Sequence, residues 1–214
     1  MKRRKTFPSV SLPGITTVAI TGIFGSGKTT VSTIFKEEGI PVIDCDKLSH
    51  QVLAKPGVIP RIRRFFGPEV ITKDGRVNRR KLAQTVFPNA QKRKWLENLI
   101  HPYVLQQIHQ RLLDYKKKKS KIVAVEIPLL FEIEAENLFT RTVVVSTAPE
   151  IIKQRLQKSF SSEEIEQRWQ CQLPQEYKIK RADFIIDNSR SRSFTRWQVK
   201  QTIKELKTEV GGRL

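Results

Sequence analysis

Short apolar runs rich in β-branched residues alternate along this chain with longer segments whose apolar residues have helical spacing. We expect strands in five such runs, at residues 15–20, 40–43, 122–125, 142–145 and 184–186. Helical spacing marks the segments 28–38, 90–118, 149–158, 163–181 and 194–207. Strands that alternate with helices are typical of a parallel sheet covered on both faces. The pattern therefore predicts an α/β fold, doubly wound in three layers.

Two helical regions extend this alternation. The stretch 47–113 carries no convincing strand, and we interpret it as a helical insertion between the second and third strands. The region 149–181 contains polar helices that meet at a turn, where Ser161 and Glu164 have the spacing of a capping box. The sequence thus predicts a basic N-terminal extension at 1–14, one domain at 15–210 and a short tail at 211–214.

The composition narrows the class of protein. The 214 residues include 40 Lys and Arg against 21 Asp and Glu, a formal net charge of +19. The positive electrostatic field from this charge would attract any anion. A basic surface that only contacts solvent explains the charge equally well. Aromatic residues are not interleaved with the basic runs and no nucleic-acid-binding signature appears, so no nucleic-acid partner is expected.

The apolar runs and the cysteines indicate the compartment. The longest apolar stretch, residues 122–131, is broken by Glu126 and Pro128, so it is too short and too polar for a membrane span. The two cysteines, Cys45 and Cys171, are too few for a disulfide framework and lack metal-ligand spacing. We expect a cytoplasmic protein, either a monomer or a small homo-oligomer.

A glycine-rich motif follows the first predicted strand. Residues 22–29 read GIFGSGKT and match the pattern G-x-x-x-x-G-K-[ST] in full. Its glycines allow successive backbone N–H groups to surround an anion at the start of the next helix. Lys28 is then expected to reach the β- and γ-phosphates of ATP, and Thr29 to offer its hydroxyl to Mg²⁺. The motif predicts a P-loop that binds Mg-ATP, with phosphate contacts from Gly22, Gly25, Ser26, Gly27, Lys28, Thr29 and Thr30.

Acidic residues follow the second and third strands. Asp44 and Asp46 are placed at the carboxyl edge of the sheet, where open α/β folds bind their ligands. Asp46 is our candidate for the carboxylate that accepts or orients an acceptor hydroxyl. The alternative is that both aspartates cap a helix that begins near Lys47. Glu126 is the candidate for an acidic group near the water shell of the metal.

Two further features allow both a functional and a structural interpretation. His101 precedes Pro102 within helical sequence, and it either packs or faces an acceptor pocket. The cations of the polar helices, Arg155 and Arg168 among them, either cover a solvated surface or belong to a lid that closes over ATP. The P-loop upstream favours the lid.

In combination these residues resemble the dephospho-CoA kinase family. The resemblance runs from about 18 to 207 and rests on the P-loop, Asp44-x-Asp46, His101-Pro102, PLLFE at 128–132 and ADFIIDN at 182–188. Further matching positions are Phe66-Gly67, Asp74-Gly75, Arg79, Arg155, Arg168, Gln172 and Lys178. The chain departs from the family pattern at Ile23 and Phe24, where Gly-Ile is usual, and at Lys158, where Arg is usual.

The resemblance implies a P-loop kinase fold with a helical acceptor-binding insertion at about 47–113 and a helical lid at about 149–181. It implies phosphorylation of the ribose 3′-hydroxyl of dephospho-CoA, the final step of coenzyme A biosynthesis, with ATP and Mg²⁺. The implied catalytic residues are Asp46, Lys28 and Arg155, with Asn188 among the nucleotide-binding residues and Asp46, Arg79 and His101 on the acceptor side. The alternatives are a nucleoside or nucleotide kinase of the same fold and a basic nucleic-acid-binding NTPase.

Overall fold

The computed structural model describes residues 12–211 of the chain. These residues form two compact units, which we call the sheet unit (12–44 and 110–211) and the helical unit (Cys45–His109). The predicted extension at 1–14 and the tail at 211–214 lie mostly outside the described residues.

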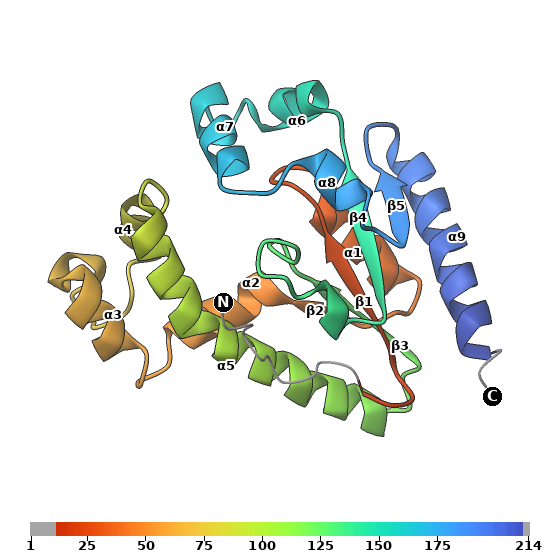
Figure 1. Cartoon of the computed structure of the whole chain (residues 1–214), viewed down its shortest axis with the longest axis horizontal. Helices are drawn as coiled ribbons and strands as arrows, with labels where there is room; N and C mark the ends of the chain where they lie inside the picture. The colour runs from red at the N-terminus through yellow and green to blue at the C-terminus, as the bar shows by residue number, and fades with distance from the viewer. Residues whose placement is uncertain (1–11, 212–214) are drawn as a thin grey trace, which may run out of the picture. The chain divides into compact units, whose positions relative to one another are not determined.

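Five parallel strands form the centre of the sheet unit (Figure 1). They are β1 (Thr16–Thr21), β2 (Val42–Asp44), β3 (Ile122–Glu126), β4 (Arg141–Ser146) and β5 (Phe184–Asp187). Their order in the sheet is β2-β3-β1-β4-β5, and all paired neighbours are parallel. Each predicted strand is present with ends within two residues of those expected, so the α/β fold class is confirmed.

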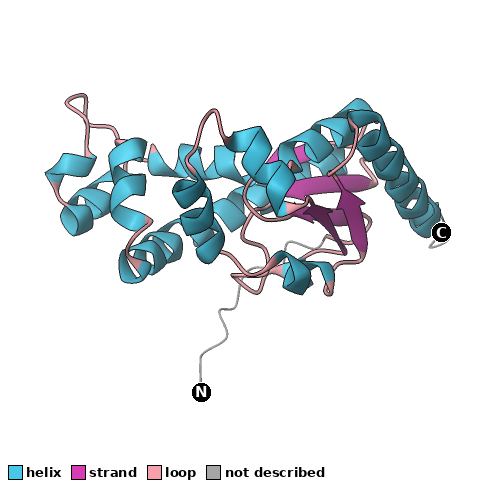
Figure 2. Ribbon diagram, turned by 90° about the horizontal axis from the view of Figure 1, so that it is seen from above, coloured by secondary structure: helices cyan, strands magenta, loops and turns pink. Residues whose placement is uncertain are grey.

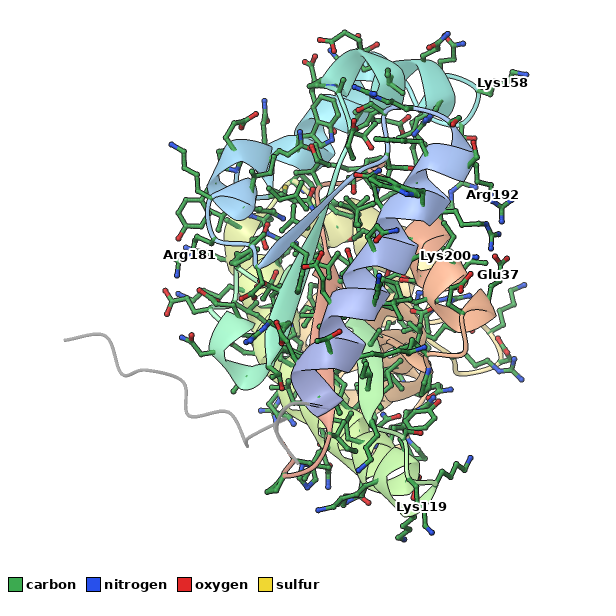
Figure 3. The ribbon with its side chains drawn as sticks, turned by 90° about the vertical axis from the view of Figure 1, so that its right-hand side faces the viewer. Glu37, Lys119, Lys158, Arg181, Arg192 and Lys200 are labelled. Atoms are coloured by element: carbon green, nitrogen blue, oxygen red, sulfur yellow. The ribbon has the colours of Figure 1, made fainter. Side chains whose placement is uncertain are left out.

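Two helices of the sheet unit cover one face of the sheet. These are α1 (Lys28–Glu37) and α9 (Arg192–Gly211), which pack on each other and share one apolar core with the strands. Phe35 of α1 and Leu206 of α9 are fully buried in that core, together with Ile20 of β1. Arg192 and Lys200 of α9 lie beside Glu37 at the end of α1 (Figure 3).

Side chains on the opposite face of the strands are also buried. Ala19, Val123 and Val144 have no exposed surface, so the central strands β1, β3 and β4 are covered on both sides as the continuous apolar runs predict, whereas Ile185 of the edge strand β5 is exposed. The remaining helices of the sheet unit are α6 (Pro149–Leu156), α7 (Ser162–Gln170) and α8 (Gln175–Ile179), and α8 packs on β4. Figure 2 distinguishes the helices from the strands.

The helical unit contains no strand among its residues Cys45–His109, as the sequence predicts. Its helices are α2 (Cys45–Leu53), α3 (Ile59–Phe66), α4 (Arg79–Val86) and the first part of α5 (Ala90–Lys117), with the 3₁₀ turn η1 (Pro68–Val70). A second 3₁₀ turn, η2 (Glu136–Leu138), belongs to the sheet unit.

Two boundary predictions are wrong. The segment 163–181 is not one helix: α7 ends at Gln170 and α8 begins after Pro174, because proline has no N–H to continue a helix and favours its first turn. The helix after β2 begins at Cys45, two residues earlier than expected, which places Asp46 inside its first turn instead of at its cap.

Candidate active site

The loop between β1 and α1 has the geometry of a phosphate cradle. Gly25 and Gly27 have φ of 81° and 88°, in the left-handed region that glycine adopts without strain. A Cβ on Gly27 would collide with the side-chain nitrogen of Asn188, so the loop also needs glycine there for space. Helix α1 starts at Lys28 without a side-chain cap, and its N-terminal amides therefore suit an anionic ligand.

Buried side chains behind the loop hold its backbone in place. The carbonyl oxygen of Ser26 accepts hydrogen bonds from Thr147 Oγ1 at 2.8 Å and from Asn188 Nδ2 at 2.9 Å. The Oδ1 of Asn188 in turn accepts from Thr195 Oγ1 at 3.0 Å, so α9 is connected to the loop through one buried amide. These bonds use both side-chain polar atoms of Asn188. In this structure the predicted nucleotide-binding residue Asn188 thus acts as a support of the loop.

Lys28 and Thr29 are the residues predicted to contact the phosphates and Mg²⁺, and both have polar contacts at the loop. Lys28 Nζ donates to the carbonyl oxygens of Gly22 at 3.1 Å and Ile23 at 2.9 Å, so its ammonium lies over the loop. Thr29 Oγ1 donates to Glu126 Oε1 at 3.0 Å. The sequence predicted Thr29 and Glu126 separately as metal-site residues. The fold brings Thr29 of α1 into contact with Glu126 at the end of β3.

The hydroxyl and the carboxylate fit a magnesium ion that is held largely by nucleotide oxygens and water. Among residues 12–211 no cluster of three or more His, Cys, Asp or Glu side chains is arranged to hold a metal by itself. A metal at Thr29 and Glu126 would therefore depend on the phosphates that arrive with it. Asp44, the last residue of β2, is in register with Glu126 at the same edge of the sheet.

The region 149–181, which we call the lid, contains α6, α7 and α8, and its closure over ATP stays a prediction. Both reciprocal bonds of the capping box are present: Glu164 N donates to Ser161 Oγ, and Ser161 N donates to Glu164 Oε2. The pKa of Glu163 is lowered by hydrogen bonds from its own backbone amide and from Ser161, so the start of α7 stays negatively charged, which suits a helix N-terminus. Lys158 lies at the turn between α6 and α7 (Figure 3).

Arg155 and Lys178 differ in their surroundings although both are cations of the lid. Arg155 is exposed, and its NH1 donates to the carbonyl oxygen of Asn188 at 2.8 Å, beside the loop. Lys178 is completely buried and pairs at 2.7 Å with Glu132, the last residue of the PLLFE segment. The same carboxylate oxygen accepts from the backbone N–H of Leu173 at 3.0 Å, so the PLLFE segment fixes the base of the lid.

Sequence reasoning did not predict two contacts between the lid and the loop: Trp169 was not named, and Gln172 was named only as a position that matches the family. Trp169 Nε1 donates to the carbonyl oxygen of Phe24 at 3.0 Å, and the backbone N–H of Phe24 donates to Gln172 Oε1 at 2.7 Å. The signal that was available is the aromatic residue at position 24 of a glycine-rich loop, because a ring there needs a partner.

The predicted acceptor-side residues belong to the helical unit. Asp46 lies exposed in the first turn of α2, Arg79 is the exposed first residue of α4, and His101 is half-buried within α5. Pro102 lies inside α5, which continues past it. The roles of these three side chains remain predictions.

The loop with its lysine, the acidic end of β3 and the helical lid define a P-loop kinase. The sequence model of the dephospho-CoA kinase family (CoaE) matches residues 16–193, which is most of the chain. The chain therefore belongs to the dephospho-CoA kinase family. This confirms the family, the ATP-using kinase class and the place in coenzyme A biosynthesis that the sequence predicted.

Relatives and solved structures agree with this assignment. The dephospho-CoA kinase of Bacillus thuringiensis is 38% identical over 191 residues, which cover 88% of this chain and 96% of that one. The crystal structure of TT1252 from Thermus thermophilus has a TM-score of 0.75 at 32% identity and covers 89% of this chain and 97% of that chain. The dephospho-CoA kinase of Campylobacter jejuni has a TM-score of 0.60 at 29% identity, with coverage of 88% and 96%.

No helix in the described part of the chain is long and apolar enough to span a membrane.

Proposed function

We propose that this chain transfers the terminal phosphoryl group of ATP to the ribose 3′-hydroxyl of dephospho-CoA, with Mg²⁺ bound beside Thr29 and Glu126. The observation that carries the proposal is the uncapped start of α1, with Lys28 over the loop and the hydroxyl of Thr29 in contact with a buried carboxylate. A cytoplasmic location and a monomeric or small oligomeric state remain part of the proposal.

The candidate site residues of the sheet unit each have a separate task in this reaction. The backbone amides from Gly25 to Lys28 bind the phosphate chain, and the Lys28 ammonium neutralises charge on its terminal groups. A bound Mg²⁺ would supply positive charge that stabilises the negative charge of the phosphate chain. The Thr29 hydroxyl would hold that ion, and the Glu126 carboxylate would orient water around it.

On the acceptor side we assign the carboxylate role to Asp46. A loose transition state for phosphoryl transfer requires little proton removal early, so a carboxylate there acts first by orienting the acceptor hydroxyl and then by taking its proton. The half-buried His101 and the exposed Arg79 are assigned to the binding of dephospho-CoA. Arg155 of the lid is assigned to the charge of the migrating phosphoryl group.

The test of the activity is ADP formation by the full-length protein with Mg-ATP, with and without dephospho-CoA. We expect turnover that depends on dephospho-CoA and that yields coenzyme A. A panel of nucleosides and nucleotides in the same assay tests the other kinase interpretation, and equal turnover with any of them would reject the assigned acceptor.

The test of the carboxylate is Asp46→Asn, which keeps the size of the side chain. We expect kcat to fall by about 10²–10⁴-fold with an unchanged melting temperature. Asp114→Asn, an exposed aspartate of α5, is the matched control and is expected to keep full activity. Near-normal turnover by Asp46→Asn would reject its catalytic role without affecting the assignment of the substrate.

A further inference from the structure

The tip of the phosphate-binding loop is fastened to the lid through both backbone groups of one residue. Phe24 donates its N–H to Gln172 Oε1 at 2.7 Å and accepts at its carbonyl oxygen from Trp169 Nε1 at 3.0 Å. Side chains of a distant segment satisfy both polar groups of residue 24. The conformation of the loop at this point is therefore set by the lid as well as by its own glycines.

The side chain of Phe24 makes a second set of contacts with the same region. Its ring meets Phe160 edge-to-face, with centroids 5.2 Å apart. The guanidinium of Arg168 lies 4.7 Å from the centroid of the Phe24 ring and 4.9 Å from that of Phe160. Three side chains, one from the loop and two from the lid, thus form an aromatic–guanidinium cluster, which we call the Phe24 cluster.

This cluster determines where Arg168 lies. A guanidinium that stacks on aromatic rings uses its flat face, whereas phosphate oxygens bind its N–H edge. Stacking and phosphate binding are therefore compatible. The two rings hold the cation beside the loop and restrict the rotamer freedom of its long side chain.

The neighbouring loop residue adds a packing contact to this attachment. A Cβ on Gly25 would meet Ile152 and Leu156 of α6, so the helix packs directly on the loop backbone. The lid is also fixed at its base, where Glu132 holds Leu173 and Lys178. The lid is attached at its base through PLLFE and at its tip through residue 24.

We propose that Phe24 is a positioning residue that fastens helix α7 to the phosphate-binding loop and thereby holds Arg168 for the phosphate chain. The inference rests on the proposed function only for the role of Arg168; the fastening itself is independent of it.

The first experiment measures the fastening without substrate or activity. Amide hydrogen exchange is followed by mass spectrometry in the full-length protein, with Phe24→Leu compared with the unchanged chain. We expect exchange in residues 157–172 to rise by about tenfold, the loss that a ring pair and a cation–π contact together predict. Phe24→Tyr, which keeps the ring, is expected to restore slow exchange.

The matched control is Phe194→Leu on α9. Phe194 also combines a ring stack, with Trp197 at 5.8 Å, and a cation, Arg190 at 4.9 Å, but it has no such contact with the loop. Its replacement is expected to leave exchange in 157–172 unchanged. Equal exchange in Phe24→Leu and the unchanged chain, or an equal rise in Phe194→Leu, would overturn the proposal.

The second experiment measures the link to Arg168 by a double-mutant cycle. We expect Phe24→Leu and Arg168→Lys each to lower kcat/KM for ATP by about tenfold, and the double variant to lose little more than Arg168→Lys alone. The KM for dephospho-CoA is expected to stay constant. Strict additivity of the two losses would show that Phe24 does not act through Arg168, even if the kinase activity itself is confirmed.

Discussion

The loop-and-lid region of the sheet unit and the helical unit Cys45–His109 are held together by different kinds of contact. Around the loop, buried polar groups bind one another: Ser26, Asn188, Thr195 and the pair Glu132–Lys178. In the helical unit aromatic rings pack on one another: Phe65 is stacked on Trp95 at 4.0 Å, and Phe66 is edge-to-face with the same ring. An ion pair of this unit, Arg76–Asp74, is exposed.

The difference concerns how strictly each region fixes the positions of its atoms. Buried hydrogen bonds have strict geometry and are costly to leave unsatisfied, so they fix the backbone of the loop. Apolar packing tolerates small changes of shape. Substitutions that remove single polar atoms should therefore cost much more near the loop than in the helical unit, and four measurements test this contrast.

The largest effect is expected from Lys178→Met. Removal of one partner of a buried pair leaves Glu132 charged and uncompensated, and such changes cost about 3–5 kcal/mol of unfolding free energy. For a chain of this size we expect the melting temperature to fall by about 6–20 °C. Arg76→Ala, which breaks the exposed pair of the helical unit, is the control and should leave the melting temperature unchanged. Equal effects of the two variants would remove the contrast.

A slightly smaller effect is expected from Lys28→Ala, measured as kcat for ADP formation. Loss of a preorganised charge at developing negative charge lowers kcat by about 10²–10³-fold. The control is Lys204→Ala, which makes the same substitution at an exposed lysine of α9, outside the loop. This variant should be as active as the unchanged chain. If Lys28→Ala stayed within threefold of normal, the assignment of the phosphate site would be wrong.

Glu126→Gln tests the metal site through the magnesium dependence of the rate. The amide keeps an oxygen for Thr29 Oγ1 but loses the charge that orders water around the ion. We expect the half-saturating Mg²⁺ concentration to rise by about 10–100-fold, the usual cost of losing an outer-shell partner. An unchanged magnesium curve would contradict the assignment of Glu126.

The smallest effect is expected from Phe66→Leu in the helical unit. Phe65 and Trp95 can repack around a smaller apolar side chain, so the loss of unfolding free energy should be about 1.5 kcal/mol or less. Phe66→Ala, which leaves a cavity, is the reference at about 3–5 kcal/mol. A loss from Phe66→Leu as large as that of Lys178→Met would show that packing in this unit is no more tolerant than the polar network.

The sequence allowed the prediction of what depends on local pattern. All five strands, the P-loop and the capping box at Ser161 follow from periodicity or from fixed spacing, and each is present. The contact of Thr29 with Glu126 could be anticipated because parallel strands end at one edge of the sheet.

The contacts between distant segments could not be read in this way. Lys178 has the spacing of a solvated helical cation, and only the position of Glu132 in space explains its burial. Trp169 and Gln172 bind Phe24 across roughly 145 residues of chain, and no local pattern encodes such a meeting. The break before α8 was signalled by Pro174, but the helical spacing on either side concealed it.

The strand order has a consequence for the way the chain folds. The central strand β1 is made first on the ribosome, yet both of its neighbours, β3 and β4, follow about a hundred residues or more later, since Thr16 pairs with Ile122 and Val18 with Arg141. Until then the backbone N–H and C=O groups along its two edges have no native partner. Chains of this topology fold slowly and are prone to aggregation until the partner strands have been synthesised. The helices of residues 45–109 can form earlier, because their contacts are local in sequence. We therefore expect the nucleotide site to be among the last parts of the nascent chain to fold.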